Sequence, residues 1–276
     1  MLNLSGRFIA LILLISLVQL LLKFLPLPNM VLFNNVVLNS EVVAETILVS
    51  SALIAFALWI YATVPYGFRS VFGRIFMGVV LFLGFESVGE LLFLISHFTS
   101  SMEVEALLHV IGGFLFVAGY LPLYASLLML LCEQRVLTRK PIESANVFAS
   151  VIFVGTLGLV WAYFVLFASQ FLSGAFNFYA VLVYTLYVVF DVVALMLIIP
   201  LVTADFRHGA LQVCIRELMV AVAVYAAADI FLNFSLLFGG KVWFMKTLAT
   251  VMYTIAYIFL AKPSIAVARI ERMTVV

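Results

Sequence analysis

The chain has 276 residues, of which 67% are hydrophobic and only 10% charged, and its formal net charge is +1. Soluble domains are about 45–50% apolar and about 25% charged, so this composition leaves too few polar residues to cover a water-exposed surface. The near-neutral charge also excludes nucleic-acid binding, which requires a basic face. We therefore expect an integral membrane protein in contact with membrane lipid.

Long apolar runs follow one another along the chain, and each is about twice as long as a membrane β-strand. They predict an all-α fold, a polytopic transmembrane bundle of eight helices in a single domain, residues 1–276. The first run has no small-x-small cleavage motif after it, so we expect an uncleaved span rather than a signal peptide. The expected spans are residues 7–26, 42–65, 72–97, 103–131, 145–170, 178–203, 214–238 and 242–263.

The lysines and arginines are distributed unequally between the two sets of expected loops. Eleven of the 14 fall on the side shared by both termini, whereas Lys23, Lys241 and Lys246 fall on the other side. Loops rich in these residues stay in the cytoplasm. We expect a multi-pass protein of the cell membrane with both termini cytoplasmic, which requires an even number of spans.

A weak internal similarity accompanies this pattern. A shift of about 142 residues lays Arg74 on Arg216, the third expected span on the seventh and the fourth on the eighth. Two halves of four helices, residues 1–140 and 141–276, would form a parallel repeat, because four spans return the chain to its starting side. Apolar helices also resemble one another by composition alone, so duplication and chance similarity both stay open.

Four carboxyl residues interrupt the apolar runs: Glu86 and Glu90 in the third expected span, Asp191 in the sixth and Asp229 in the seventh. An ionised carboxylate inside a bilayer is costly, so such residues usually face the interior of a bundle and have a partner. We expect these four to line one intramembrane site that opens toward the non-cytoplasmic side. The alternative is that each acid is protonated or hydrogen-bonded and only locks helices together.

Polar and aromatic residues accompany the acids at helical spacing. Asp229 and Asn233 are one helical turn apart, and the three alanines before Asp229 allow a neighbouring helix to approach closely. The residues expected to bind at the site or to line its mouth are His109, Tyr184, Tyr187, Lys246, Tyr253 and Asn233, together with Glu86 and Asp191.

No motif identifies a cofactor, which stays unknown. The carboxyl residues come from separate expected spans and match no HExxH-type spacing, so no metal site is expected. His97 and His109 fall at span ends, where histidines are more often ordinary interface residues than haem ligands. Lys246 also lies at a span end, too shallow for a retinal Schiff base.

Two short motifs resemble a known family. GELLFLIS at 89–96 and IGGFLF at 111–116 are similar to segments of the YhhN family of membrane lysoplasmalogenases. This resemblance implies eight spans, with an acidic residue after a glycine in the first half and a second acidic residue in the other half.

The residues that match the two acidic positions of the family are Glu90 and Asp229. The chain departs from the family pattern by having glutamate for aspartate at Glu90, and by having Ala118 where the family has a histidine. The resemblance implies that Glu90 and Asp229 form a catalytic acid/base pair that attacks an ether-type bond of a lipid headgroup.

Three functions are compatible with these residues. The first is a lipid-active membrane hydrolase in which Glu90 and Asp229 are catalytic and Glu86 and Asp191 tune them. The second is a transporter or proton-coupled carrier in which the same acids relay protons or bind a cation. The third is a non-catalytic anchor subunit of a larger, quinone-linked complex.

Overall fold

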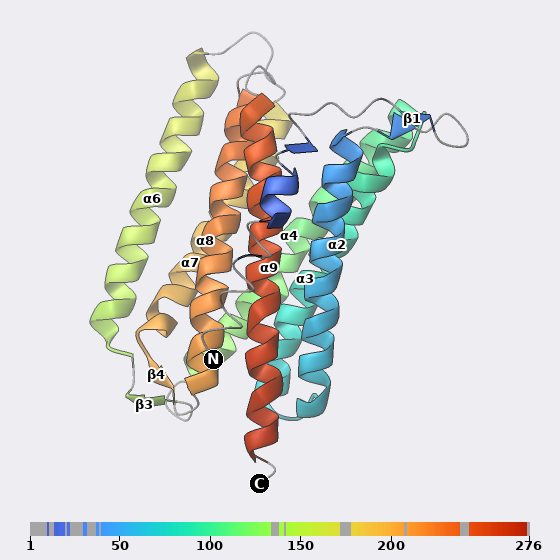
Figure 1. Ribbon diagram of the computed structural model, residues 1–276. Helices are drawn as coiled ribbons and strands as arrows, with labels where there is room; N and C mark the ends of the chain where they lie inside the picture. Colours follow the sequence, from blue (N-terminus) through green and yellow to red (C-terminus); the bar gives the residue numbers. More distant parts are fainter. Residues whose placement is uncertain are drawn as a thin grey trace.

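The computed structural model describes residues 10, 14–19, 21–22, 30–31, 37–38, 40–133, 138–140, 142–171, 178–206, 209–237 and 243–274 (Figure 1). This part of the chain is helical, as expected, apart from two short pairs of strands. The α-helices are α2 (Ser40–Thr63), α3 (Val71–Ser96), α4 (Met102–Cys132), α6 (Ser144–Phe171), α7 (Phe178–Val202), α8 (Gly209–Leu237) and α9 (Trp243–Thr274). The short turn η2 (Val64–Tyr66) follows α2, and the antiparallel strand pairs are β1 (Met30–Val31) with β2 (Val37–Leu38) and β3 (Thr138–Lys140) with β4 (Asp205–Phe206).

Four of the described helical segments are long and apolar enough to cross a membrane: Ser40–Tyr66, Val71–Ser96, Met102–Cys132 and Phe244–Ile265. Two shorter apolar helices, Ser144–Gly155 and Leu186–Val202, lie in the fifth and sixth expected spans. The first expected span, 7–26, is helical at 14–19 and 21–22, and its other residues lie outside the described part. The last helix is longer than expected, because α9 continues to Thr274 instead of ending at residue 263.

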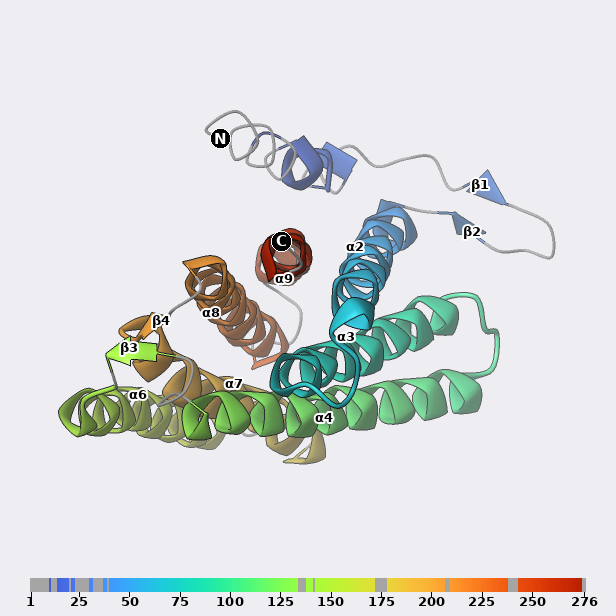
Figure 2. The ribbon, with the colours of Figure 1, turned by 90° about the horizontal axis from the view of Figure 1, so that it is seen from below.

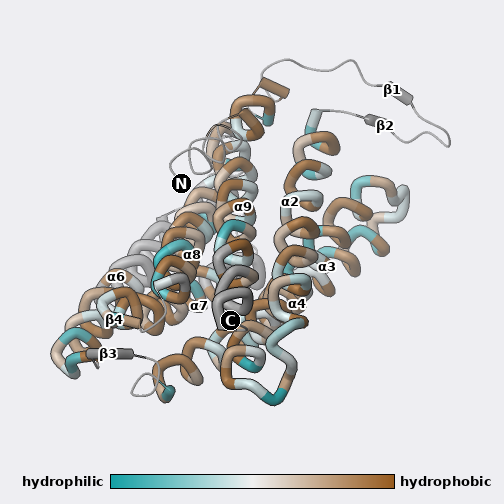
Figure 3. The backbone as a smooth tube through the Cα atoms, turned by 60° about the horizontal axis from the view of Figure 1, so that its bottom comes forward, coloured by the Kyte–Doolittle hydropathy of each residue, from teal (hydrophilic) through white to brown (hydrophobic). Residues whose placement is uncertain are grey.

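The exterior of the bundle is apolar as well as its core. Ile54, Phe114 and Leu121 are each more than half exposed, at 58%, 64% and 65%. Hydrophobic residues predominate along the helices (Figure 3). A helix that is hydrophobic on all sides is typical of a membrane span or of a large buried core, and so many exposed apolar side chains favour the membrane.

Hydroxyl caps set the start of two membrane-length helices. Ser70 accepts a hydrogen bond from the Gly73 amide at 2.8 Å at the start of α3, and Ser101 accepts one from the Val104 amide at 3.4 Å at the start of α4. Gly67 adopts a φ of 63° in the turn between α2 and α3, a conformation that glycine adopts without steric cost. These short connections make successive helices antiparallel neighbours.

Six helices contact one another in a closed ring, in the order α2, α3, α4, α7, α8 and α9. Helix α3 packs between α2 and α4, α9 packs between α2 and α8, and α7 contacts α4, α6 and α8. Figure 2 shows α9 between α8 and α2. If α2, α3 and α4 are matched with α7, α8 and α9, each of these packed pairs has a counterpart. The pair α2–α3 corresponds to α7–α8, α3–α4 corresponds to α8–α9, and α2–α9 corresponds to α7–α4. Two parallel halves would give this pattern, so the packing favours the repeat, which stays a prediction.

Two hydrogen bonds fasten α2 to α9 near Pro263. The Trp59 indole donates to the Leu260 carbonyl at 2.6 Å, and the Tyr66 hydroxyl donates to the Val267 carbonyl at 2.6 Å. Leu260 lies in the turn before Pro263, where proline supplies no amide hydrogen, so the Trp59 side chain supplies a donor there. Val267 lies one turn after the proline and receives its donor from the turn η2. Trp59 is fully buried and its ring lies 5.8 Å from that of Phe76, so it is a packing residue of the core.

Gly78 allows α3 and α4 to approach closely. A Cβ atom at this position would lie 1.7 Å from Ser126 Oγ and 2.4 Å from the Pro122 carbonyl oxygen. We expect Gly78→Ala to lower the free energy of unfolding by about 1–3 kcal/mol, because the backbone of α4 would have to move. Thermal unfolding in detergent measures this effect.

Gly155→Ala is the matched control, because among the described residues its added Cβ would meet only Met196 Cε, at 3.3 Å, the end of a flexible side chain. This control should unfold at nearly the wild-type temperature. Equal melting temperatures for the two variants would contradict the close α3–α4 contact.

Candidate functional site

The four carboxyl residues singled out in the sequence are all buried in the helical core. The exposed fraction is 0% for Glu86 and Asp191, 4% for Asp229 and 8% for Glu90. Glu86 and Glu90 come from α3, Asp191 from α7 and Asp229 from α8. Buried carboxyl groups need hydrogen-bond partners, and tyrosine hydroxyls of α4, α8 and α9 supply them.

The first group of contacts joins the two glutamates through two tyrosines, and we call it the glutamate network. The Tyr225 hydroxyl donates to Glu86 Oε2. The Tyr257 hydroxyl lies 3.2 Å from Glu86 Oε2, 3.1 Å from Glu90 Oε1 and 3.2 Å from the Tyr225 hydroxyl. The Tyr257 hydroxyl therefore connects the two glutamates, and both tyrosines reach the same carboxyl oxygen of Glu86.

The hydroxyl groups of Tyr225 and Tyr257 have fewer hydrogens than the network has hydrogen-bonding contacts. Tyr225 and Tyr257 have one hydroxyl hydrogen each, whereas the network contains four hydrogen-bonding contacts. An ionised carboxylate can only accept. Four contacts need four hydrogens, so the glutamate network is complete only when two further protons reside on its carboxyl groups. This arrangement is suited to holding and releasing protons.

The second group of contacts, which we call the aspartate network, contains Asp191 and Asp229. The Tyr120 hydroxyl donates to Asp191 Oδ1 and the Tyr253 hydroxyl donates to Asp229 Oδ1. The two carboxyl groups are near enough to interact. Oδ2 of each is buried and receives no N–H or O–H donor from the described residues, so a proton shared between the two carboxyl groups would complete their contact. This pair also has unused capacity for a proton.

The two networks are neighbours. The rings of Tyr225 and Tyr253 pack edge to face with centroids 5.0 Å apart. A small cavity lies beside them, lined by Phe82, Tyr120, Leu123, Asp191, Ala221, Val222, Tyr225 and Leu260. The volume open to the centre of a water molecule is about 10 Å³, which is room for about one water.

The partners of the four acids are tyrosine hydroxyls and neighbouring carboxyl groups, not cations, in the part of the chain that the structure describes. Those residues also contain no group of three or more His, Cys, Asp or Glu arranged to hold a metal ion. Four negative charges without a cation would repel one another in an apolar core, so the cluster has to carry protons.

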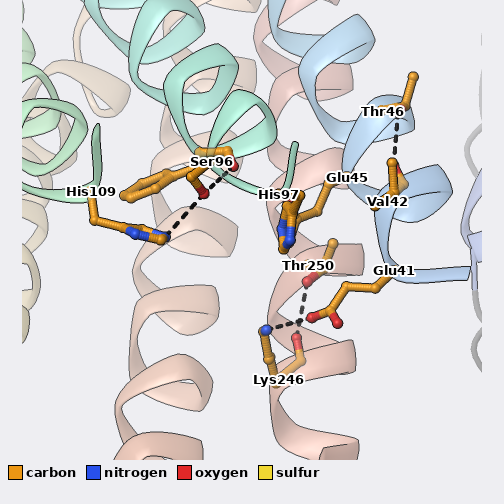
Figure 4. A network of polar contacts seen from close by, with 10 residues as sticks. Glu41, Val42, Glu45, Thr46, Ser96, His97, His109, Lys246 and Thr250 are labelled. Carbon is orange, nitrogen blue, oxygen red and sulfur yellow. Dashed lines mark hydrogen bonds and ion pairs between the residues drawn. The ribbon is translucent and has the colours of Figure 1, made fainter. Parts of the chain in front are cut away.

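A separate polar cluster lies at the ends of α2, α3 and α9 (Figure 4). Glu45 pairs with His97 at 2.6 Å and Glu41 pairs with Lys246 at 2.5 Å. Because Glu41 and Glu45 are one turn apart on α2, the two ion pairs tie this helix to both of its neighbours. We call these four residues the outer ion pairs. The charge of Glu45 also acts on Glu90, which links this end of the bundle to the glutamate network.

Several residues expected at the site lie elsewhere. His109 contacts the Glu105 carbonyl at 3.0 Å and Ser96 at 3.5 Å, and its ring lies 4.9 Å from that of Phe93. The Tyr187 hydroxyl donates to the Gly113 carbonyl at 3.3 Å.

Of the other expected residues, Tyr253 belongs to the aspartate network through its bond to Asp229. Lys246 belongs to the outer ion pairs. Asn233 is buried in α8 at 7% exposure, and the Tyr184 side chain lies outside the described residues.

The sequence pattern indicated Tyr257 only as part of a polar stripe with Lys246 and Tyr253, and Tyr225 was missed, so neither tyrosine partner of Glu86 was placed at the site. Tyr225 is four residues before Asp229 and Tyr257 is four residues after Tyr253, so each shares a helical stripe with a residue that was singled out. That spacing was the available signal. His97 was interpreted as an ordinary residue at a span end, whereas it forms an ion pair with Glu45.

The hydrogen bond and the charge of Glu45 raise the pKa of His97, although partial burial and the charge of Lys246 oppose the shift. A histidine whose pKa is raised by folding stabilises the fold at pH values below its unfolded-state pKa of about 6.5. This stabilisation is lost as the pH rises through its pKa in the folded protein. We therefore expect the free energy of unfolding of wild type, relative to that of His97→Gln, to fall by up to about 1 kcal/mol between about pH 6 and pH 8.5. The effect is small because the ion pair is partly exposed. Melting temperatures of both proteins in detergent at the two pH values measure this, and parallel curves would contradict it.

Comparisons with known proteins gave no match to a family model, to a curated protein or to a solved structure. The site is therefore interpreted from its own chemistry.

Proposed function

We propose that the chain is an integral membrane protein of eight spans, with both termini cytoplasmic, in which the carboxyl–tyrosine cluster takes up and releases protons as part of a proton-coupled carrier. The proposal rests on the hydrogen-bond partners of the four acids. Glu86, Glu90, Asp191 and Asp229 are buried together, and their partners among the described residues are hydroxyl groups rather than cations.

The energetic cost of burying the cluster depends on its charge. Burying one unpaired carboxylate costs several kcal/mol, and neighbouring carboxylates of like charge increase this cost. Protons remove the charge without requiring space. A change in the charge of the cluster therefore has to be a change in its proton content, which is the chemical step that proton-coupled carriers use.

The arrangement of the helices supports the proposed sidedness. Strands β3 and β4 and the C-terminus lie at one end of the bundle, which also contains the loop from α2 to α3 with Arg69 (Figure 1). Cationic loops favour the cytoplasm for this end. Glu86 is then about 22 Å along α3 from Val71, in the outer part of a hydrocarbon core about 30 Å thick.

The outer ion pairs are suited to be the entrance of a proton route. They lie at the opposite end of α3 from the cationic loops, and Glu45 acts electrostatically on Glu90. A histidine beside a carboxylate exchanges protons near neutral pH. Protons from the non-cytoplasmic side would reach Glu90 by way of Glu45 and His97, and then Glu86 by way of Tyr257.

A lipid-active hydrolase is less well supported by the geometry. Such an enzyme needs substrate in contact with Glu90 and Asp229, but a tyrosine hydroxyl already occupies one oxygen of each carboxyl group. The cavity beside the cluster has room for about one water, not for a lipid headgroup. Proton exchange requires no larger space.

Reconstituted vesicles distinguish these functions. Purified protein in liposomes with an internal pH-sensitive dye should acidify the lumen after an external acid jump, and Glu90→Gln and Asp229→Asn should each abolish the protein-dependent rate. Glu103→Gln removes an exposed acid in the first turn of α4 and should leave the rate unchanged.

The same liposomes should contain an ether-linked lysolipid, with its products analysed by mass spectrometry. Product formation without proton movement would overturn the proposal in favour of the hydrolase. Identical proton fluxes in wild type, Glu90→Gln and Asp229→Asn would also overturn it.

A further inference from the structure

A hollow of about 200 Å³ lies between the first turn of α3 and the last turns of α4, two helices that pack side by side (Figure 2). Its described lining contains one cation, Arg74, and one anion, Glu133, together with the thiol of Cys132. The hollow is separate from the carboxyl–tyrosine cluster, because Arg74 is about 18 Å along α3 from Glu86. It is a second candidate site, at the end of the bundle that contains the α2–α3 loop.

The two charged groups reach the hollow from different helices without pairing. Arg74 belongs to α3, and Glu133 follows the last residue of α4. Neither side chain forms an ion pair with another residue in the part of the chain that the structure describes. A cation and an anion that line one hollow without contacting each other are both available to a ligand that has the two opposite charges.

The anion lies nearer to the end of the bundle than the cation. Gly78 of α3 is level with Ser126 of α4, because a Cβ atom on Gly78 would lie 1.7 Å from Ser126 Oγ. Toward the helix ends, Arg74 is one turn beyond Gly78, whereas Glu133 is two turns beyond Ser126. The backbone of the acid is therefore one turn closer to the aqueous phase than the backbone of the cation.

The deeper part of the hollow is apolar and open to the membrane. Leu128 contributes to its wall and is 49% exposed, and Ala125, one turn deeper on α4, is also exposed. Met129 adds a flexible side chain that adapts to an irregular apolar guest. Exposed apolar side chains on a helix of membrane length contact lipid chains. A lipid can therefore enter the hollow sideways from the bilayer.

We infer that this hollow binds one phospholipid with a primary-amine headgroup, phosphatidylethanolamine. From the water inward, this lipid has an ammonium group, a phosphate group and acyl chains. The wall provides groups that suit them in the same order, namely Glu133, Arg74 and the apolar side chain of Leu128. A guanidinium group binds phosphate by two parallel hydrogen bonds, and a carboxylate accepts hydrogen bonds from an ammonium group. The inference does not depend on the proposed proton chemistry.

Each charged residue selects against a different class of lipid. A pocket with cationic side chains alone would suit an anionic headgroup such as that of phosphatidylglycerol. The Glu133 carboxylate repels additional negative charge and provides an acceptor for N–H donors. Phosphatidylcholine has a quaternary ammonium group without N–H donors, so it satisfies Arg74 but not Glu133. The pair of charges therefore favours phosphatidylethanolamine over both other lipids.

Native mass spectrometry of purified protein in micelles with equal amounts of phosphatidylethanolamine, phosphatidylcholine and phosphatidylglycerol measures this selectivity. Wild type should carry one phosphatidylethanolamine. Arg74→Gln should bind phospholipid at least about tenfold more weakly, as expected when a charged hydrogen bond is lost. Glu133→Gln should still bind lipid but prefer phosphatidylglycerol. Arg69→Gln and Glu103→Gln remove exposed charges that do not line the hollow and should bind as wild type does.

The Cys132 thiol allows a measurement on the unmodified wall, which covers the case in which Arg74→Gln does not fold. Cys132 is exposed and lines the hollow, whereas Cys214 is buried. A methanethiosulfonate reagent should modify Cys132 at least about threefold more slowly in liposomes that contain phosphatidylethanolamine than in phosphatidylcholine liposomes, because only the lipid-free fraction reacts.

Three results would overturn the inference: equal binding of the three lipids by wild type, an unchanged preference in folded Glu133→Gln, or equal rates of Cys132 modification in the two kinds of liposome. None of these measurements follows proton movement. Failure of the proposed carrier function therefore leaves the lipid site intact, and loss of the lipid site leaves proton uptake to be judged separately.

Discussion

Glu86→Gln is expected to reduce proton uptake by reconstituted protein roughly 100-fold, the loss typical of removing a positioned proton-transfer group. Oε2 of Glu86 lies within hydrogen-bonding distance of the hydroxyls of both Tyr225 and Tyr257, so Glu86 is the carboxyl group that both tyrosines of the glutamate network reach. Glutamine preserves the shape of the side chain and can still accept these bonds at its carbonyl oxygen. It cannot release a proton.

The same substitution should destabilise the fold only moderately. The amide nitrogen of glutamine would occupy the position of Glu86 Oε1, which has no hydrogen-bond partner among the described residues. An unsatisfied buried donor costs about 1–3 kcal/mol, so the protein should remain folded but melt at a lower temperature. Dye-reported uptake and thermal unfolding of one preparation separate the two effects. Retention of the wild-type uptake rate by folded Glu86→Gln would exclude Glu86 from the route.

The sequence predicted the helices well because membrane spans are specified locally. An apolar run of the right length specifies a span without information about its neighbours. The expected spans 72–97 and 103–131 therefore agree closely with α3 and α4. Helix ends that depend on specific contacts agreed less well. The last expected span, 242–263, agrees with the membrane-length apolar segment Phe244–Ile265, whereas the helix itself continues beyond that segment to Thr274. Trp59 and Tyr66 of a neighbouring segment donate to carbonyls of this part of α9.

The candidate site was only partly predictable, for a geometric reason. The four acids were recognisable because carboxylates in apolar runs are costly and therefore rare. Their partners depend on which helices meet, and a tyrosine side chain is long enough to connect helices whose backbones are not immediate neighbours. Tyr225 on α8 reaches Glu86 on α3 in this way. Spacing within one helix could indicate Tyr253, but it could not indicate which acid a tyrosine of another helix would contact.

Tyr257→Phe is expected to slow proton uptake at least about tenfold, because it removes the hydroxyl that lies between Glu90 and Glu86. This hydroxyl is 3.1 Å from Glu90 Oε1 and 3.2 Å from Glu86 Oε2. Without it, the described residues contain no hydrogen-bonded oxygen between Glu90 and Glu86. Loss of the hydrogen bond itself should cost only about 1 kcal/mol of stability, because the phenyl ring keeps the packing of the fully buried side chain.

Tyr66→Phe is the matched control for this route. It also removes one tyrosine hydroxyl, the donor to the Val267 carbonyl, but Tyr66 lies in η2, far along the bundle from the acids. Both variants should fold with a moderate loss of stability, since each removes a tyrosine hydroxyl that holds α9 to its neighbours. Only Tyr257→Phe should lose proton uptake. Equal uptake by both variants would show that protons do not pass from Glu90 to Glu86 through Tyr257, whereas equal loss would assign the effect to the packing of α9.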